Sequence, residues 1–318
     1  MVRRGSEINE VSRFITAAID GVPKNADAKH VGEALIDAYR QIEAASRGED
    51  VNFVPSGYTD FDTVFGGLAR SGLVIVAARP AMGKTSFALG LARQAAAKGP
   101  VLAVSMEMPA SHLAMRLMSA EAGVPLQNLM RGELGPEDFR RATAAVNRLK
   151  ECGLWINDLP SRDLHGVLAE ARRFRRQHPD MRMLVIDYLT LMQRPQADRA
   201  DLAIGEMSRA LKVLAGEIDC PVVLLSQLNR RLEERPLSDR RPRMSDLRES
   251  GAIEQDADQI VFLYREEVYR KTPENEGLAE IIMAKNRNGR TGIVRMAWIA
   301  ERAAFVELAG FEEGRNVA

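Results

Sequence analysis

Apolar residues near the N-terminus recur at helical spacing. Two stripes repeat every three or four positions, and they consist of Ile8, Val11, Ile15 and Ile19, and of Val31, Leu35, Ile36, Tyr39 and Ile42. This spacing predicts two amphipathic helices, the first ended by Gly21-Val22-Pro23 and the second running between His30 and Ala45. The second helix either covers a patch of its own core or forms an arm that packs on a neighbouring subunit.

From residue 51 onward, short apolar runs alternate with helical patterns. The runs predict strands at Leu73–Ala78, Val101–Ser105, Leu154–Asn157, Met183–Asp187, Val222–Gln227 and Ile260–Tyr264. Nearly continuous Val, Ile and Leu is typical of strands that are buried on both faces. Helical patterns follow at Ser86–Ala97 and Ala203–Ile218. The alternation predicts an α/β fold, with a mostly parallel twisted sheet and helices on both faces.

Near the C-terminus the alternation stops. Two apolar runs, Ile281–Lys285 and Ile293–Trp298, flank a short polar stretch that contains Asn288-Gly289, and this predicts a hairpin at the edge of the sheet. We therefore expect a helical N-terminal segment with a linker helix (1–50), one α/β domain (51–312) and a tail (313–318).

Composition narrows the function classes. Hydrophobic residues make up 46% of the 318 residues and charged residues 28%, which suits a globular protein. No apolar run is long enough to span a membrane, and no secretory signal follows the basic N-terminus. The two cysteines fit a reducing, cytoplasmic location and exclude a zinc site of four cysteines, while the four histidines are scattered, which makes a histidine metal site improbable.

Charge and aromatic content bear on nucleic-acid binding. The formal net charge is zero and aromatic residues make up 5%. A net-neutral chain can bind a polyanion only locally, in loops or in a channel. So few aromatic residues argue against a stacking platform for single strands.

A phosphate-binding motif is the strongest chemical signal. The residues from Ala78 to Thr85 read ARPAMGKT, after an apolar strand and before a helix. This order is typical of a P-loop, although its first position is Ala78 rather than glycine. Backbone N–H groups of such a loop surround an anion at a helix N-terminus. The predicted nucleotide-binding residues are Ala81, Met82, Gly83, Lys84, Thr85, Ser86 and Asp187.

Three further polar residues end predicted strands, where an open α/β sheet binds its ligands. Asp187 ends the run MLVID and is the expected Walker B carboxylate, which together with Thr85 would hold Mg²⁺. Glu107, just after a strand, is the candidate general base, although a solvated strand-end carboxylate is the alternative. Gln227 is the candidate sensor of the γ-phosphate. The expected substrate is ATP or another NTP, with Mg²⁺.

Six motifs in order resemble one family. ARPAMGKT, SMEM, LVIDYL, LLSQLNR, SDLRESGAIEQDAD and AKNRNGRTG are similar to motifs of the C-terminal RecA-like ATPase domain of DnaB replicative helicases, and the similarity runs from about His30 to about Leu308. The resemblance implies a RecA-like P-loop core and a homohexameric ring. The ring would use NTP hydrolysis to move along single-stranded DNA, and a 5′–3′ polarity is expected from the resemblance alone.

The resemblance also implies roles at two other places. Lys285 and Arg287 match finger residues that reach the nucleotide site of the neighbouring subunit. The matching DNA-binding residues lie in a channel loop and are Arg248, Glu249 and Gly251. The preceding residues 229–247 are rich in arginine and proline, and they suit either a mobile channel loop or an ordinary solvated one. A second basic run, Arg172–Arg176, is read as a solvated helix face.

The sequence differs from the family pattern in two respects, and two alternative functions stay open. Arg290 stands where the family commonly has proline, and the family's helical N-terminal domain has no counterpart in the sequence. That domain docks primase and forms the collar of the ring, so a primase or a helicase loader is only a possible partner. A recombinase- or KaiC-like ATPase is a weaker match, because the DLRESGAIEQDAD motif is not expected in it. A helicase-like subunit that pairs with a partner without unwinding is the other alternative.

Overall fold

The computed structural model of the protein describes residues 30–158, 163–187, 200–247 and 250–308, without the side chains of 200–203 and 250. The chain divides into two compact units, Met1–Asn52 and Phe53–Ala318. The predicted helix around Ile8–Ile19 and the tail 313–318 lie outside the described residues. No helix in the described ranges is both long enough and apolar enough to cross a bilayer.

The described part of the first unit is mainly one helix, α2 (Val31–Ser46). It begins where the sequence predicts, because the Nδ1 atom of His30 accepts a hydrogen bond from the backbone N–H of Gly32 at 3.1 Å and so caps the helix. Its apolar residues Val31, Leu35 and Ile42 are exposed.

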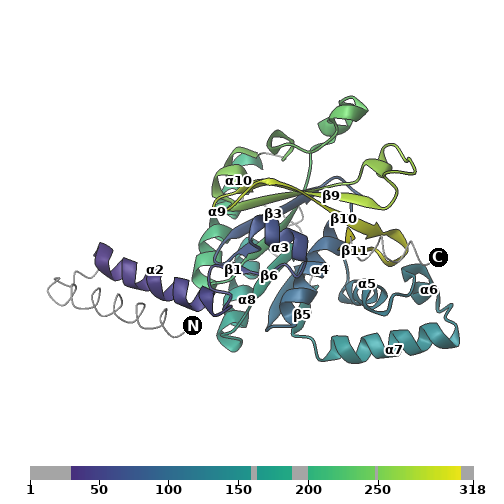
Figure 1. Cartoon of the computed structure of the whole chain (residues 1–318), viewed down its shortest axis with the longest axis horizontal. Coiled ribbons are helices and arrows are strands. Elements are labelled where there is room, and N and C mark those ends of the chain that lie inside the picture. The colour runs from purple at the N-terminus through teal and green to yellow at the C-terminus, as the bar shows by residue number, and fades with distance from the viewer. Residues whose placement is uncertain (1–29, 159–162, 188–199, 248–249, 309–318) are drawn as a thin grey trace, which may run out of the picture. The chain divides into compact units, whose positions relative to one another are not determined.

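The second unit is built on a nine-stranded sheet (Figure 1), counted over the described residues. In spatial order the strands are β11 (Ala304–Glu307), β10 (Gly292–Ile299), β9 (Leu278–Asn286), β8 (Gln259–Tyr264), β3 (Leu73–Ala78), β7 (Val222–Gln227), β6 (Met183–Asp187), β4 (Val101–Ser105) and β5 (Leu154–Asn157). The six from β8 to β5 are parallel, and the other three are antiparallel. The predicted mostly parallel sheet is confirmed.

Helices cover both faces of this sheet. The larger ones are α4 (Lys84–Ala96), α5 (Ala110–Ala122), α7 (Pro136–Lys150), α8 (Leu164–Gln177) and α9 (Ala200–Ile218). The shorter ones are α3 (Thr59–Phe65), α6 (Leu126–Arg131) and α10 (Ser250–Asp256). A separate pair of short strands, β1 (Phe53–Val54) and β2 (Leu68–Ala69), flanks α3.

Alternate residues of each central strand belong to different cores. Leu73 and Ile75 of β3 pack with α8 and α9, whereas Val74 and Val76 pack with α3 and α4. This is why the strands carry nearly unbroken apolar runs: successive side chains point to opposite faces, and here both faces are buried.

The predicted hairpin forms, because β9 and β10 pair antiparallel, but it is not the edge of the sheet. A further strand, β11, pairs with β10 beyond it, with Ala297 opposite Val306. The sequence analysis missed β11 because the strand has only four residues, of which one, Phe305, has a buried side chain, and so short a pattern does not predict a strand.

The arginine-rich residues 229–247 are not an irregular loop. They contain three 3₁₀ turns, Arg230–Glu234, Leu237–Asp239 and Met244–Asp246. Three of the arginines form ion pairs with acids of the same unit: Arg235 with Asp246, Arg241 with Glu280, and Arg243 with Asp239. These acidic partners were not part of the sequence argument, and whether the segment is mobile stays a prediction.

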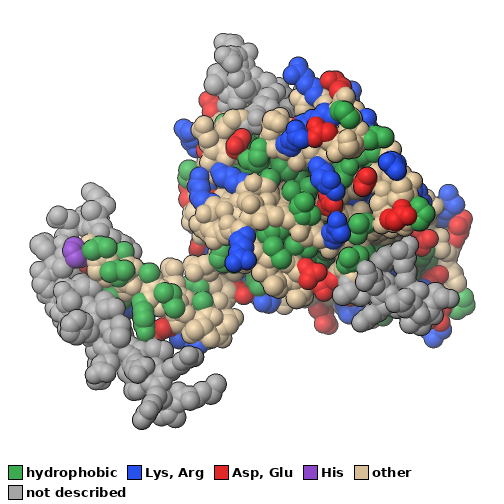
Figure 2. Space-filling view, turned by 45° about the horizontal axis from the view of Figure 1, so that its top comes forward, with side chains coloured by type: hydrophobic (Ala, Val, Ile, Leu, Met, Phe, Trp, Pro, Cys, Tyr) green, Lys and Arg blue, Asp and Glu red, His purple; other side chains and the backbone are tan. Residues whose placement is uncertain are grey.

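The basic run on α8 is a solvated face, as predicted. Arg172 and Arg173 are exposed and form ion pairs with Glu217 and Glu170. Positive and negative side chains are interspersed over the visible face of the second unit (Figure 2), in keeping with the zero net charge.

Candidate nucleotide-binding site

The P-loop lies between the end of β3 and the start of α4, as its sequence predicts. Gly83 has φ +94° and precedes the first helical residue, Lys84, so the loop turns directly into the helix N-terminus. A Cβ at Gly83 would lie 2.9 Å from ring atoms of both Phe305 and Trp298. Glycine is therefore required here by backbone conformation and by space.

Lys84 and Thr85 meet the Walker B carboxylate. The hydroxyl of Thr85 donates to Oδ2 of Asp187 at 2.9 Å, and the Lys84 ammonium lies 3.6 Å from Oδ1. Asp187 is buried, and its Oδ1 is one of few buried side-chain atoms in the described residues that have no hydrogen-bond partner. The Thr85 hydroxyl oxygen and the two Asp187 carboxylate oxygens, one of which lacks a hydrogen bond, therefore form a set of oxygen ligands that fits Mg²⁺.

The turn with Glu107 is tied to Asp187. The backbone N–H of Met106 donates to the Asp187 carbonyl at 2.8 Å, and Ser105, the last residue of β4, lies beside Asp187 in the sheet. The Ser105 hydroxyl donates to the Met108 carbonyl at 2.8 Å and so closes the turn. Glu107 is thereby held, exposed, at the strand end where the sequence predicts it.

Glu107, Gln227 and most of the P-loop line one cavity, whereas Asp187 is connected to it through its hydrogen bond with Thr85. The cavity has a volume of about 870 Å³, and its lining includes Glu107 and Gln227 together with P-loop residues Ala78, Arg79, Pro80, Ala81, Gly83, Lys84, Thr85 and Ser86. Gln227, the last residue of β7, pairs with Ala78 of β3. The size suits a ligand of nucleotide dimensions. The side chain of Met82 is buried in the core, so any phosphate contact of this residue would come from its backbone, the group that the P-loop pattern predicts for it.

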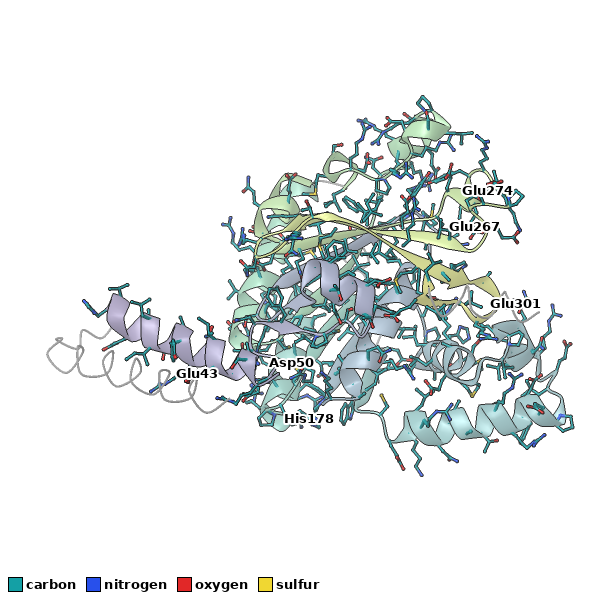
Figure 3. All side chains as sticks on the ribbon, in the orientation of Figure 1. Glu43, Asp50, His178, Glu267, Glu274 and Glu301 are labelled. Carbon is teal, nitrogen blue, oxygen red and sulfur yellow. The ribbon has the colours of Figure 1, made fainter. Side chains whose placement is uncertain are left out.

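Two arginines that the sequence analysis did not single out shape the loop. Arg79 is buried and donates to the Leu228 carbonyl at 2.9 Å and to Glu233 at 2.8 Å. Arg265, just after β8, donates to the Ala81 carbonyl at 2.9 Å, forms an ion pair with Glu267 and stacks 4.5 Å from the centre of the Trp298 ring. Figure 3 labels Glu267. Ala81 has φ +65°, so the Arg265 contact holds a strained residue in place.

Other polar residues also line the cavity without a sequence signal. Arg116 comes from α5, Asn128 from α6, and Glu301 from the short turn after β10. The sequence did not predict these three residues as part of the site, because they come from separate elements that only the folded structure brings together.

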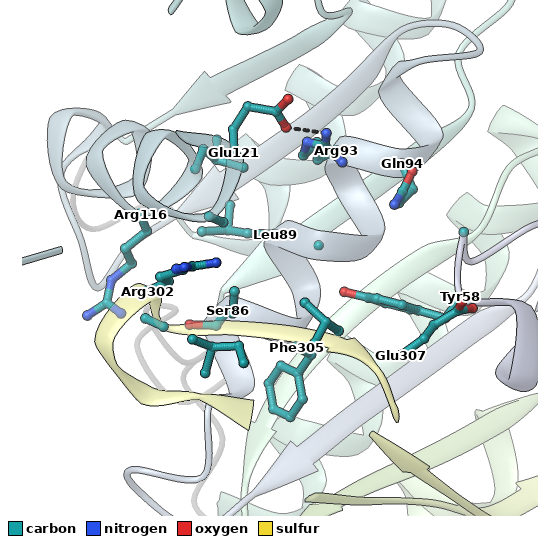
Figure 4. A pocket seen from close by; sticks show the side chains of 18 residues that line it. Tyr58, Ser86, Leu89, Arg93, Gln94, Arg116, Glu121, Arg302, Phe305 and Glu307 are labelled. Carbon is teal, nitrogen blue, oxygen red and sulfur yellow. Dashed lines mark ion pairs between the residues drawn. The ribbon is translucent and has the colours of Figure 1, made fainter. Parts of the chain in front are cut away.

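A second cavity, of about 800 Å³, shares Ser86, Arg116 and Ala303 with the first. Its walls come from α4, α5 and β11 (Figure 4), and Arg93 in it forms an ion pair with Glu121. Burial raises the pKa of Tyr58 in this wall, with Glu307 adding to the effect and Arg93 opposing it. Most P-loop residues line the first cavity, which is therefore the candidate phosphate site.

The two finger candidates are far from this cavity. The backbone N–H of Arg287 donates to the Asp258 carbonyl at 2.8 Å, and the Asp258 N–H donates to the carbonyl of Leu73, the first residue of β3. The P-loop follows the other end of β3, and a strand of six residues spans about 20 Å. Arg287 and Lys285 thus lie near the amino-terminal ends of the parallel strands, whereas their own P-loop lies at the carboxyl ends.

Of the three candidate DNA-binding residues, the structure describes one, Gly251. Gly251 is exposed, at the second position of α10. Arg248 and Glu249 lie outside the described residues. The structure therefore brings together the P-loop, Asp187, Glu107 and Gln227, and places Lys285, Arg287 and Gly251 elsewhere.

Comparison with known proteins agrees with this geometry. The chain is 44% identical over 286 residues to the replicative DNA helicase DnaB of Geobacillus stearothermophilus, covering 88% of this chain and 62% of that protein. It is 42% identical to the replicative DNA helicase DnaC of Bacillus subtilis, covering 90% of this chain and 63% of that protein. The chain thus spans less than two thirds of the length of these relatives.

Solved structures give the same picture. A structure described as an ATPase domain superposes with a TM-score of 0.82 at 36% identity, covering 89% of this chain and all of that one. A DnaB-like replicative helicase, described with its interactions with primase, superposes with a TM-score of 0.79 at 33% identity, covering 96% of this chain and 76% of that one. The family of the DnaB-like helicase C terminal domain matches residues 53–307. The fold, the arrangement of the P-loop and these matches together mean that the chain belongs to the DnaB-like helicase C terminal domain family.

Proposed function

We propose that this chain is the motor of a DnaB-type replicative DNA helicase, a homohexameric ring that hydrolyses ATP or another NTP and moves along single-stranded DNA in the 5′–3′ direction. We also propose a cytoplasmic location. The similarity to two replicative DNA helicases supports the helicase assignment. The observation that carries the ring is the position of Arg287, at the opposite edge of the sheet from the P-loop.

The proposed chemistry divides between two subunits. In one, P-loop N–H groups and Lys84 bind the β- and γ-phosphates, and Glu107 accepts a proton from the attacking water. Gln227 contacts the γ-phosphate region. Thr85 and Asp187 would hold Mg²⁺, which neutralises charge on the phosphate oxygens.

The neighbouring subunit supplies the remaining charge. A guanidinium at the far edge of a subunit cannot reach that subunit's own phosphates across about 20 Å of sheet. In a closed ring of heterologous contacts it faces the phosphates of the next subunit instead. Arg287 and Lys285 then stabilise negative charge that develops on the transferred phosphoryl group.

The DNA segment is proposed from Arg248 through Glu249 to Gly251. Contacts there would be to the phosphate backbone, which carries no base information, so binding is expected to tolerate any sequence. Six such segments around one axis would concentrate positive charge in a channel, which reconciles DNA binding with a net charge of zero.

A mixing experiment tests the shared site. Arg287→Ala and Lys84→Ala proteins are each expected to hydrolyse NTP poorly. When the two are mixed, an Arg287→Ala subunit supplies an intact cradle and its Lys84→Ala neighbour an intact finger, so about a quarter of the interfaces in random rings become competent.

Recovery of hydrolysis on mixing supports the proposal, and its absence contradicts a finger acting between subunits. Mass measurement with Mg²⁺ and a non-hydrolysable ATP analogue, with and without oligo-dT, checks the assembly. A hexamer is expected. A monomer that hydrolyses at full rate at every dilution, or an open filament, would favour another RecA-like ATPase.

A further inference from the structure

The finger residues are held at one end of α10. The ammonium of Lys285 donates to the Glu254 carbonyl at 2.6 Å, and a terminal nitrogen of Arg287 donates to the Gln255 carbonyl at 3.1 Å. Both carbonyls belong to the last turn of α10 (Ser250–Asp256). Carbonyls there lack helical partners and carry partial negative charge, so they attract cations.

Asp258 provides the second attachment of Arg287. Its Oδ1 accepts from the Arg287 guanidinium at 3.3 Å, and its carbonyl accepts from the Arg287 backbone N–H at 2.8 Å. The side chain and the backbone of Arg287 are thus both bound to one residue.

Asp258 itself is firmly fixed. The side chain is 8% exposed, and its Oδ2 accepts from the backbone N–H of Leu73 at 2.8 Å and from the Lys212 ammonium at 2.6 Å. Its own backbone N–H donates to the Leu73 carbonyl at 2.9 Å. The carboxylate is therefore attached to the start of β3, the central strand that leads to the P-loop of the same subunit.

The Arg287 side chain remains available while it is held. It is 50% exposed, and the two named contacts use only part of the five N–H donors of a guanidinium. An arginine fixed on one side and exposed on the other is oriented before its ligand arrives. Orienting a long side chain in advance removes an entropy cost from the step in which it acts.

We propose that Asp258 is a positioning residue for Arg287, holding the guanidinium in the direction in which it meets the nucleotide of the neighbouring subunit. This inference rests on the proposed function, because it needs the finger to act between subunits. The alternative is that Asp258 only joins the start of β8 to β3 through Leu73.

Asp258→Asn separates these alternatives. Asparagine keeps an oxygen that can accept from Leu73, but loses the charge that orients Arg287. We expect kcat for NTP hydrolysis to fall by about 3- to 10-fold, the range that corresponds to ordering one long side chain. KM for NTP, the affinity for oligo-dT and the hexamer mass are expected to stay within about twofold, because the cradle and the DNA segment are untouched. Lys212→Met, which removes the other cation on Asp258, is the matched control and is expected to retain kcat.

A mixing test guards against simple misfolding of the variant. Adding Lys84→Ala subunits, which hydrolyse nothing themselves but carry a well-oriented finger, should raise turnover per Asp258→Asn subunit, while the same addition to the unchanged protein should not. An unchanged kcat in Asp258→Asn, or a loss that Lys84→Ala subunits do not relieve, overturns the inference. If Arg287→Ala and Lys84→Ala fail to complement each other, the proposed function fails instead.

Discussion

The hydroxyl of Thr85 lies 2.9 Å from Oδ2 of Asp187, although the two residues are 102 positions apart in the chain. The contact joins the first turn of α4 to the end of β6, and it brings two hard oxygen ligands to one point. Thr85→Ala is expected to raise the Mg²⁺ concentration for half-maximal hydrolysis by about ten- to hundredfold, since a contact to a charged group contributes ~1.5–3 kcal/mol. A Mg²⁺ titration of NTP hydrolysis measures this. Thr85→Ser, which keeps the hydroxyl, should need no extra Mg²⁺, and an unchanged requirement in Thr85→Ala would remove Thr85 from the metal site.

Gly83, the one glycine in the P-loop sequence ARPAMGKT, leaves no room for a side chain. Gly83→Ala places a Cβ 2.9 Å from the Phe305 and Trp298 rings at φ +94°, and it is expected to lower the free energy of unfolding by ~1–3 kcal/mol. Urea unfolding measures the change. Gly216→Ala is the control, because its Cβ meets nothing within 4 Å on the exposed side of α9 and should stabilise by up to ~1 kcal/mol. Equal effects of the two substitutions would contradict the strained conformation of Gly83.

The buried guanidinium of Arg79 depends on Glu233. Glu233→Gln is expected to cost ~1–2 kcal/mol of unfolding free energy, less than a fully buried pair, because the Glu233 side chain is 44% exposed. A double-mutant cycle with Arg79→Met should give a coupling energy of at least ~0.5 kcal/mol. Exposed Glu234→Gln next to it should change stability by less than ~0.5 kcal/mol. A coupling energy near zero would mean that the ion pair does not stabilise the fold.

Arg265 fixes the backbone of the P-loop through the Ala81 carbonyl. Arg265→Lys keeps the charge but not the planar group that bonds Ala81 and Glu267 while it stacks on Trp298. Nucleotide affinity is expected to fall by about three- to tenfold, since one net hydrogen bond is worth ~0.5–1.5 kcal/mol. Titration with a fluorescent nucleotide tests this, with the exposed Arg270→Lys as the control. Equal affinity in the two variants would count against a role for Arg265 in shaping the loop.

Arg248 is the proposed contact to DNA phosphate. Arg248→Ala should weaken oligo-dT binding and reduce the slope of log affinity against log salt by roughly 0.7, the contribution of one released counterion on a single strand. Arg172→Ala, on the solvated face of α8, should leave the slope unchanged. If both variants keep the original slope, Arg248 is not part of the DNA path.

Local features of the fold could be predicted well. The bounds of β3, β4, β5, β6 and β7 coincide with the predicted ranges. For β3, β4, β6 and β7 the reason is that buried parallel strands carry nearly unbroken apolar runs, whereas β5, the last strand of the sheet, is only partly buried. The P-loop could be predicted for the same reason, since strand, turn and helix are consecutive in the chain. Asp187, Glu107 and Gln227 followed from one rule, that such sheets bind ligands at the carboxyl ends of their strands.

The contacts that hold the site in place could not be predicted. Arg79 reaches Glu233 across 154 residues, Arg265 reaches Ala81 across 184, and Asp258 reaches Leu73 across 185. No local pattern encodes such pairs, since each depends on strand order in the finished sheet. The short strands β1, β2 and β11 were missed for a related reason: two to four residues pair only because distant segments meet there.

The placement of Arg287 at the far edge of β3 has a consequence for inheritance. In the proposed ring, a subunit with a defective Arg287 would keep a sound pocket of its own and disable the one next door. In a cell that makes both kinds of copy, rings would still assemble, and each altered subunit would silence one pocket, which often belongs to an unaltered neighbour. An allele that merely prevents folding would leave every assembled ring fully active, because its product never enters the ring.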